Sequence, residues 1–400
     1  MLFDKSINDL TINDINLFCE NNGEGYRIEY KSSFDDNVRR KIPQIVSSFA
    51  NSHGGVLIIG VRTNGNRAIL PIAGIERPDR EEITLTIQNL CRDNIYPAIF
   101  PIIKEITAEQ NNIVIIVFVE ESIDSPHAIE NKRKVYIRTG DSAEPHDLCD
   151  LQRMRGLFEK KDQSKILIEN LEKRSFDFLK EPISNIFLLP HLRIIITPTF
   201  PRNKIINKND LYNFCRNLRT QTAIRYDDLF AVANLKRISD GICGHLPGRW
   251  FFYLNMFGFL SSFHISNFRN YIGQEGERQI KVINFSQTIE EIAYNLHLMK
   301  QLFITAAWDG NVLIKFSFKK VKDTSLSIFN DDEITTNIAL EDDINSFYET
   351  DSFNVKSIDN AIISNLLYDA IWSFYQFETN PYYDAIQNQI SELIPGLGLN

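Results

Sequence analysis

Apolar and polar residues along the first 160 residues follow patterns that switch between a helical and a strand period. Helical spacing occurs in residues 11–21 and 35–55, and in the second range it forms one apolar stripe of Val38, Ile42, Ile45 and Phe49. We expect Pro43 either to kink this helix or to start its main part. We expect Gly54 and Gly55 to end it.

Strand-like segments separate these helices. Residues 26–33 alternate, whereas the run VLIIGV at 56–61 is wholly apolar, as is typical of a strand buried on both faces. The residues TNGN at 63–66 predict a turn. Further strands are expected at 98–106, 112–121 and 134–140, and further helices at 77–95 and 145–160. We therefore predict an α/β domain over residues 1–160, in which a mixed sheet is flanked by helices.

The remaining residues, 161–400, predict a second domain of α+β type, joined to the first by a polar helix at 161–176. The aromatic run at 250–263 is interpreted as a buried strand or helix rather than an interaction surface. Later patterns predict a strand at 310–321 and helices at 288–308, capped by Thr288, and 358–377. This half contains no motif that indicates a particular chemistry.

Composition agrees with a soluble globular protein, since 43% of the 400 residues are hydrophobic and 24% are charged. The net charge of -9 does not favour a general nucleic-acid coat, although a local basic groove would be enough to bind nucleic acid. The five cysteines contain no C-x-x-C pair, which is typical of a protein in a reducing compartment. We find no signal peptide and no segment that could cross a membrane, so a cytoplasmic protein is expected.

The stretch EGYRIEYK places two glutamates and a lysine around the first predicted strand. Glu29 and Lys31 are two positions apart and therefore share a face of the strand. Glu24 is an odd number of positions before Glu29, so the two carboxylates converge only if the chain bends, as Gly25 would allow. Such a group could hold a hard divalent cation, with the lysine positioning water or neutralising an oxyanion. The alternative is an ordinary surface ion pair.

A second group of basic residues lies in the segment NKRKVYIR at 131–138. Its cations alternate with an aromatic side chain, a combination that suits a phosphate backbone and an unstacked base. The predicted nucleic-acid contacts here are Lys132, Arg133, Tyr136 and Arg138. For Lys132 and the neighbouring Lys134, a solvated hairpin edge is an equally good interpretation.

Several of these motifs occur in an order that resembles the Schlafen AlbA-like domain family. The pattern of that family is a glutamate, four residues, E-[FY]-K, then S-x-FAN, a small G-G, an apolar strand ending in G-V, and a closing Y-I-R-x-G. The corresponding positions here are Glu24, 29–31, 47–51, 54–55, 60–61 and 136–140. The resemblance covers roughly residues 24–150, whereas the C-terminal region is not recognised.

The resemblance implies a metal-dependent endoribonuclease. In nuclease-active members of the family, two glutamates and an aspartate bind a divalent metal, Mg²⁺ or Mn²⁺, and cleave RNA such as tRNA-like substrates. The two glutamates map onto Glu24 and Glu29, with Lys31 beside them. The aspartate normally follows the G-V, but here Arg62 and Thr63 stand in its place. Glu76 and Asp79 are candidates for a replacement carboxylate.

Arg62 has three interpretations. In the first, it binds a phosphate bidentately, which favours a nucleic-acid binder. In the second, it pairs with Glu24 or Glu29 where the metal would have been. In the third, it points to solvent. We favour the first two, because Arg62 directly follows a buried strand.

Two functional hypotheses follow from these residues. The first is an endonuclease acting on RNA. The second is a catalytically inactive module that binds RNA or DNA, or serves as a scaffold. A third, weaker hypothesis places the chain in a prokaryotic, antiviral defence system, where the C-terminal domain would bind a protein partner or a second copy of the chain.

Overall fold

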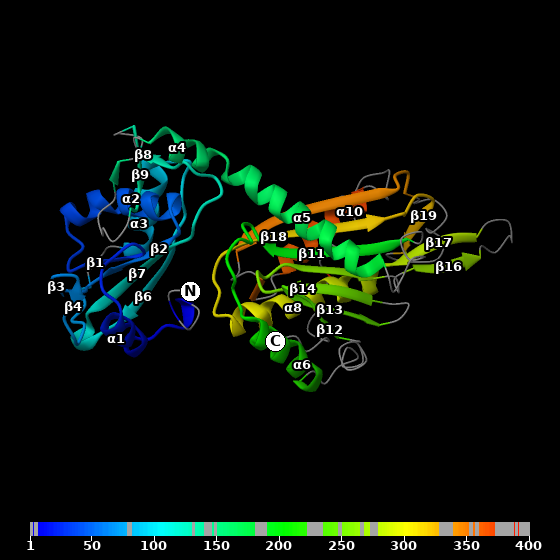
Figure 1. Ribbon diagram of the computed structural model, residues 1–400, viewed down its shortest axis with the longest axis horizontal. Coiled ribbons are helices and arrows are strands. Elements are labelled where there is room, and N and C mark those ends of the chain that lie inside the picture. Colours follow the sequence, from blue (N-terminus) through cyan, green and yellow to red (C-terminus); the bar gives the residue numbers. More distant parts are fainter. Residues whose placement is uncertain are drawn as a thin grey trace. The chain divides into compact units, whose positions relative to one another are not determined.

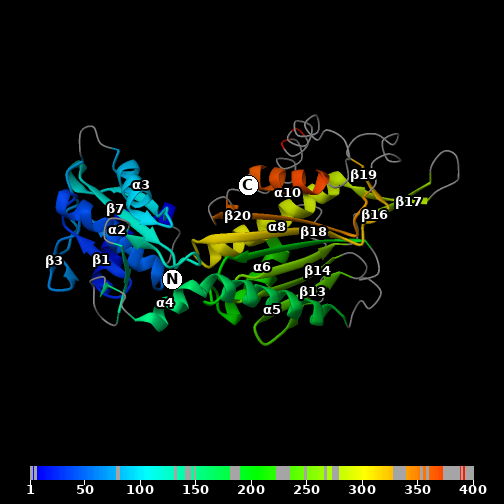
Figure 2. The same ribbon diagram turned by 90° about the horizontal axis from the view of Figure 1, so that it is seen from above.

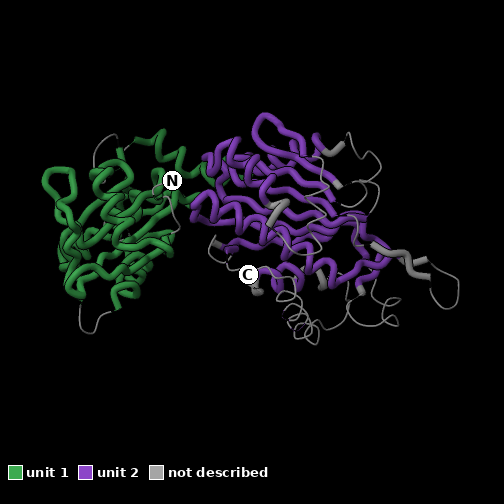
Figure 3. Tube along the Cα trace, turned by 90° about the horizontal axis from the view of Figure 1, so that it is seen from below, with its two compact units in different colours: residues 1–165 green, residues 166–400 purple. Residues whose placement is uncertain are grey.

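The computed structural model describes residues 3, 7–77, 82–129, 133–139, 146–147, 150–180, 190–221, 235–246, 250–264, 268–272, 279–327, 339–351, 355–356, 360–372, 388 and 391. The chain divides into two compact units, residues 1–165 and 166–400, which Figure 3 shows in different colours. Each unit has a hydrophobic core of its own.

The central sheet of the first unit has four strands in the order β1-β2-β7-β6 (Figure 1). β1 runs parallel to β2, while β2 with β7 and β7 with β6 are antiparallel. The predicted mixed sheet is therefore confirmed. The strand bounds are Ile28–Lys31 for β1, Gly55–Ile59 for β2, Ile102–Thr107 for β6 and Ile113–Val119 for β7.

Helices cover both faces of this sheet (Figure 1). α2 (Asp36–Asn51) and α3 (Ile83–Asn94) pack on one face, and α1 (Ile12–Asn21) packs on the other. The predicted stripe of α2 is buried, as expected. Pro43 lies inside this helix and does not start it, because the side chain of Asp35 accepts the N–H groups of Asn37 and Val38 and so caps an earlier start.

A second small sheet of the first unit has the order β10-β9-β8-β5. Its strands are β5 (Ile95–Tyr96), β8 (Ala128–Ile129), β9 (Lys134–Ile137) and β10 (His146–Asp147). The predicted turn at 63–66 is a hairpin, formed by β3 (Thr63–Asn64) and β4 (Arg67–Ala68). The helix expected from residue 145 begins later, since α4 spans Leu151–Phe158 behind a cap from Asp150. The short helices η1 (Ile7–Asp9) and η2 (Glu109–Asn111) complete the unit.

The end of α2 is joined to the small sheet by the buried side chain of Asn51. Its Nδ2 donates to the carbonyl oxygens of His127 and Tyr136, both at 2.9 Å, and its Oδ1 accepts the N–H of His127 at 2.8 Å. A single amide therefore holds β8, β9 and the last turn of α2 together. This connection places residue 138 beside the central sheet.

The second unit is of α+β type, as predicted. Its main sheet is antiparallel, in the order β12-β13-β14-β15-β11-β18-β20. α5 lies on one face, and α6, α8 and α10 lie on the other (Figure 2). The helix bounds are Lys160–Lys180 for α5, Lys208–Gln221 for α6, Phe285–Thr305 for α8 and Asn360–Trp372 for α10.

The strands of the main sheet are β11 (His191–Pro198), β12 (Lys236–Arg237), β13 (Gly241–Leu246), β14 (Trp250–Asn255), β15 (Leu260–His264), β18 (Asn311–Lys319) and β20 (Asp343–Asp351). A three-stranded sheet contains β16 (Phe268–Ile272), β17 (Gln279–Asn284) and β19 (Thr324–Ser327). The aromatic run at 250–263 is thus two buried strands, which confirms that it is core. Thr288 is not the cap of α8, because Asn284 fills that position and accepts the N–H of Gln287.

Among the described residues, none of the helices combines the length and the apolar character that crossing a bilayer requires.

We expect the substitution Asn51→Ala to destabilise the first unit by about 2–4 kcal/mol, because it leaves buried backbone groups of His127 and Tyr136 without their partners. Urea unfolding measures this change. Asn21→Ala is the control, since the Asn21 side chain is exposed and bonds only within α1. If both substitutions cost the same, the amide of Asn51 does not carry this connection.

The same region predicts a pH effect on stability. Burial lowers the pKa of His127 below its usual 6.5, although a bond from Nδ1 to the carbonyl of Pro97 partly opposes this shift. Below pH 6.5 the unfolded chain takes up a proton that the folded chain does not. The free energy of unfolding should therefore fall as the pH falls below 6.5, by up to about 1.4 kcal/mol per pH unit. Urea midpoints should depend less on pH in His127→Gln, and an equal dependence would contradict the assignment.

Candidate functional site

The chain bends sharply just before β1, where Gly25 was expected to allow a bend. Gly25 and Ile28 exchange backbone hydrogen bonds of 3.0 and 3.4 Å, so Tyr26 and Arg27 form the corner. The carbonyls of Arg27 and Lys31 face β2, which means that the N–H of Tyr30 points to the free edge of the sheet. Glu24 accepts that N–H through Oε1 at 2.9 Å. The carboxylate of Glu24 therefore closes the edge of β1.

Glu29 lies on the face of β1 that α2 covers, and its side chain is only 6% exposed. Its Oε1 accepts from Nζ of Lys31 at 2.5 Å, which confirms that the two residues share a face. Its Oε2 accepts from Nη2 of Arg138 at 3.0 Å. One carboxylate is thus bonded to two cations.

Arg138 is the buried partner in this group, with a side chain that is 0% exposed. Its guanidinium carbon lies 4.3 Å from the centre of the Phe49 ring, and its backbone N–H donates to Oγ of Ser52 at 2.9 Å. Phe49 lies in the last turn of α2, and Ser52 is the residue that follows the helix. Gly55 is needed there, because a Cβ at this position would lie 2.3 Å from the Phe49 ring. The end of α2 therefore fixes Arg138 against Glu29.

These residues do not fit a divalent metal. Glu29 with Lys31 and Arg138 makes a group whose net charge is positive, and a positive site repels a hard cation. Glu24 uses one carboxylate oxygen for a backbone N–H. No cluster of three His, Cys, Asp or Glu side chains suited to a metal occurs among the described residues. Glu76 is exposed, and Asp79 lies outside the described residues.

Two predicted nucleic-acid contacts need correction. Arg138 is buried and bonded to Glu29, so it is not an exposed phosphate contact. Tyr136 is 7% exposed, and its ring belongs to the core beneath α2, so it offers no stacking face. Arg133 is exposed at the start of β9, as that prediction requires. Lys132 lies outside the described residues.

Arg62 lies on the surface, at the foot of the β3–β4 hairpin, as does Arg67 within it. Neither arginine makes an ion pair with a residue that the structure describes. Glu29 is bonded to Lys31 and Arg138, and Glu24 to the backbone of Tyr30, so Arg62 pairs with neither glutamate among the described contacts. The tip of the hairpin is held in place, because the carbonyl of Asn66 accepts the N–H of Glu24 at 2.7 Å.

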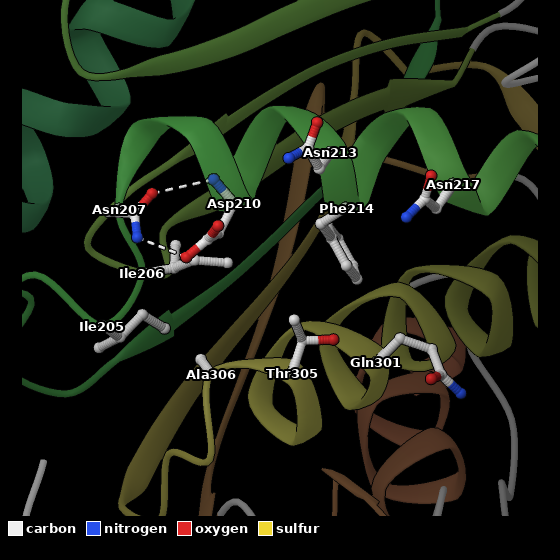
Figure 4. A pocket seen from close by; sticks show the side chains of 10 residues that line it. All are labelled: Ile205, Ile206, Asn207, Asp210, Asn213, Phe214, Asn217, Gln301, Thr305 and Ala306. Atoms are coloured by element: carbon white, nitrogen blue, oxygen red, sulfur yellow. Dashed lines mark hydrogen bonds between the residues drawn. The ribbon is translucent and has the colours of Figure 1, made fainter. Parts of the chain in front are cut away.

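The second unit has a cavity of about 530 Å³ between α6 and the end of α8 (Figure 4). Uncharged polar side chains line it together with apolar ones, among them Phe214 and Ala306. Its one acid, Asp210, accepts from the Asn207 side chain and is thereby part of the cap of α6. An adjoining cavity of about 470 Å³ adds Lys204 and Lys208. The larger cavity suits uncharged polar groups.

Sequence reasoning missed the residues that support Glu29. Ser52, Asn51 and Lys160 all contribute, and Lys160 donates to the backbone carbonyls of both of the others. The period of β9 was an available signal for Arg138, since positions 136 and 138 share a face and Tyr136 points to the core. For Lys160 we find no local signal, because the two carbonyls that it bonds lie 109 and 108 positions away.

Comparison with known proteins gives one family and several solved structures. A comparison with curated proteins found no match. A crystal structure of a protein from Corynebacterium diphtheriae is 14% identical with a TM-score of 0.23, and the match covers 31% of this chain and 22% of that one. The N-terminal domain of a RecG-related protein from Nitrosomonas europaea, whose name refers to an ATP-dependent DNA helicase, is 17% identical with a TM-score of 0.26. That match covers 36% of this chain and 96% of that domain.

The family model described as Schlafen, AlbA_2 matches residues 24–147. This match confirms the resemblance seen in the sequence for the N-terminal domain, and it ends before the second unit begins. Through residues 24–147, the chain therefore carries a domain of the Schlafen AlbA_2 family.

Proposed function

We propose that the first unit binds the phosphate backbone of a nucleic acid, and that Glu24 and Glu29 support the fold instead of holding a catalytic metal. The observation that carries this proposal is the bonding of Glu29 to both Lys31 and Arg138. A group that is already positive repels Mg²⁺ or Mn²⁺. The family match supports a nucleic-acid-related function.

The exposed arginines supply the contacts. Arg62 and Arg67 lie on one hairpin, with the amide side chains of Asn64 and Asn66 between them. Arginine binds phosphate with two parallel hydrogen bonds, and asparagine adds neutral donors. Arg133 is a further exposed cation of the same unit. A local basic element of this kind can bind nucleic acid even though the whole chain is acidic.

The competing hypothesis is a metal-dependent endoribonuclease that acts on tRNA-like substrates. It is favoured by the presence of Glu24, Glu29 and Lys31 at the positions where the family pattern has them. It requires that a metal displace Lys31 or Arg138 from Glu29, and that a further carboxylate join the site. A role in a prokaryotic defence system, with a partner on the second unit, stays a separate hypothesis about pathway.

Binding without cleavage is the expected behaviour of the full chain. Incubated with tRNA, ribosomal RNA or single-stranded DNA and Mn²⁺ or Mg²⁺, the protein should retard the nucleic acid in a gel shift and leave its length unchanged. Glu29→Gln should lower the melting temperature, since it leaves Arg138 without its charged partner, and it should not abolish binding at low temperature. Metal-dependent cleavage that Glu29→Gln removes would establish the nuclease instead.

Arg62→Ala and Arg67→Ala should each weaken binding for all sequences alike. Each should also lower the slope of log K against log salt by roughly one unit, because each removes about one phosphate contact. Arg92→Ala is the matched control, since Arg92 is an exposed arginine of the same unit that is bonded to its neighbour Asp93. Equal slopes for all of these variants would place the interface elsewhere.

A further inference from the structure

The side chain of Lys160 is buried among acceptors at the end of α2. Its Nζ donates to the carbonyl of Asn51 at 3.2 Å and to that of Ser52 at 3.3 Å, and it lies 2.8 Å from Oε1 of Glu121. The residue is 7% exposed. A lysine with this degree of burial and this number of partners has a fixed position.

The two carbonyls are the acceptors that a helix leaves open at its C-terminal end. Asn51 is the last residue of α2 and Ser52 is its cap. The negative end of a helix favours a nearby cation, yet the last turn of α2 contains no basic residue. Lys160 supplies this charge from a distant part of the chain.

The residues at this end of α2 also position the side chains of the proposed site. Oγ of Ser52 accepts the N–H of Arg138 at 2.9 Å, and Arg138 bonds Glu29 at 3.0 Å. Glu29 bonds Lys31, whose carbonyl accepts the N–H groups of Gly60 and Val61, just before Arg62. A shift of Lys160 therefore reaches the foot of the basic hairpin through consecutive bonded groups.

Lys160 is also the first residue of α5, which continues past the boundary between the units at residues 165 and 166. Further along this helix, Ile168 and Leu171 belong to a buried cluster of the second unit with Tyr253. Glu172 lies 3.6 Å from Arg193 in that unit and bonds Lys315. The first residue of α5 thus supports the site, and later residues of the same helix pack on the sheet of the second unit.

We propose that Lys160 is a positioning residue through which the second unit regulates the nucleic-acid site. It holds the end of α2, and with it the array of Ser52, Arg138 and Glu29, in the arrangement that presents the hairpin. Its own ammonium group makes no contact with nucleic acid. The regulatory part of this inference rests on the proposed function, whereas the positioning part does not.

Lys160→Met in the full chain tests the positioning, with Lys161→Met as the matched control. Both substitutions remove one positive charge from the start of α5, but Lys161 is exposed and pairs with Asp124 at the surface. Hydrogen exchange should speed up at the amide of Arg138 by roughly tenfold in Lys160→Met, about the loss of one hydrogen bond. It should be unchanged in Lys161→Met. Unchanged exchange at Arg138 in both variants would overturn the positioning role.

Nucleic-acid affinity separates positioning from general destabilisation. Well below the melting temperature, Lys160→Met should weaken tRNA binding several-fold and leave the salt slope unchanged, because no phosphate contact is lost. Lys160→Arg should restore most of the affinity. A lower melting temperature with unaltered affinity would mean that Lys160 only stabilises α2. If the unaltered chain binds no nucleic acid, the proposed function fails, and exchange at Arg138 still decides the positioning.

Two glycines inserted between Lys165 and Ile166 test the coupling. The insertion interrupts α5 at the boundary and leaves Lys160 and its partners in place. We expect faster exchange at Arg138 and weaker tRNA binding, as in Lys160→Met. If both quantities stay at the values of the unaltered chain, the second unit does not act on the site through α5.

Discussion

The arrangement of the first unit depends on the buried ion pair between Glu29 and Arg138. Glu29 belongs to β1 and Arg138 directly follows β9, 109 positions later, and both side chains are almost fully removed from water. A buried charge without a partner costs several kcal/mol, so each residue requires the other. The pair thereby fixes the small sheet against the central one. Phe49 and Ser52 hold the arginine from the side of α2, and Lys31 completes the group.

The same pair carries the proposal about which ligand the site binds. A carboxylate that two cations already neutralise is a poor ligand for a hard divalent ion. Arg62, in the place where an acid was expected, changes the charge in the same direction, and it does so at the surface. Under the proposed function, both features disfavour a metal, although only Arg62 departs from the family pattern.

Local sequence predicted those parts of the fold that depend on local sequence. The stripe of α2, the apolar strand β2 and the bend at Gly25 all follow from spacing or from backbone freedom. The period of β9 indicated that Arg138 faces the core, but its bond to Glu29 did not follow, because the two positions are 109 residues apart. The strands of the second unit's main sheet could not be told apart in the sequence for another reason. Its two aromatic strands, β14 and β15, are separated by a short turn at 256–259 and appear in the sequence as one apolar run.

The two glutamates act on β1 from different sides. Glu24 closes the free edge by accepting the N–H of Tyr30, and Glu29 neutralises Arg138 on the face beneath α2. The backbone of Glu24 also holds the tip of the hairpin through Asn66, where a Cβ on Gly23 would lie 2.7 Å from the same carbonyl oxygen. A substitution of either side chain therefore removes a bond that holds β1 before it affects any chemistry. Loss of activity in such a variant indicates catalysis only when the fold of the unit has been shown to persist.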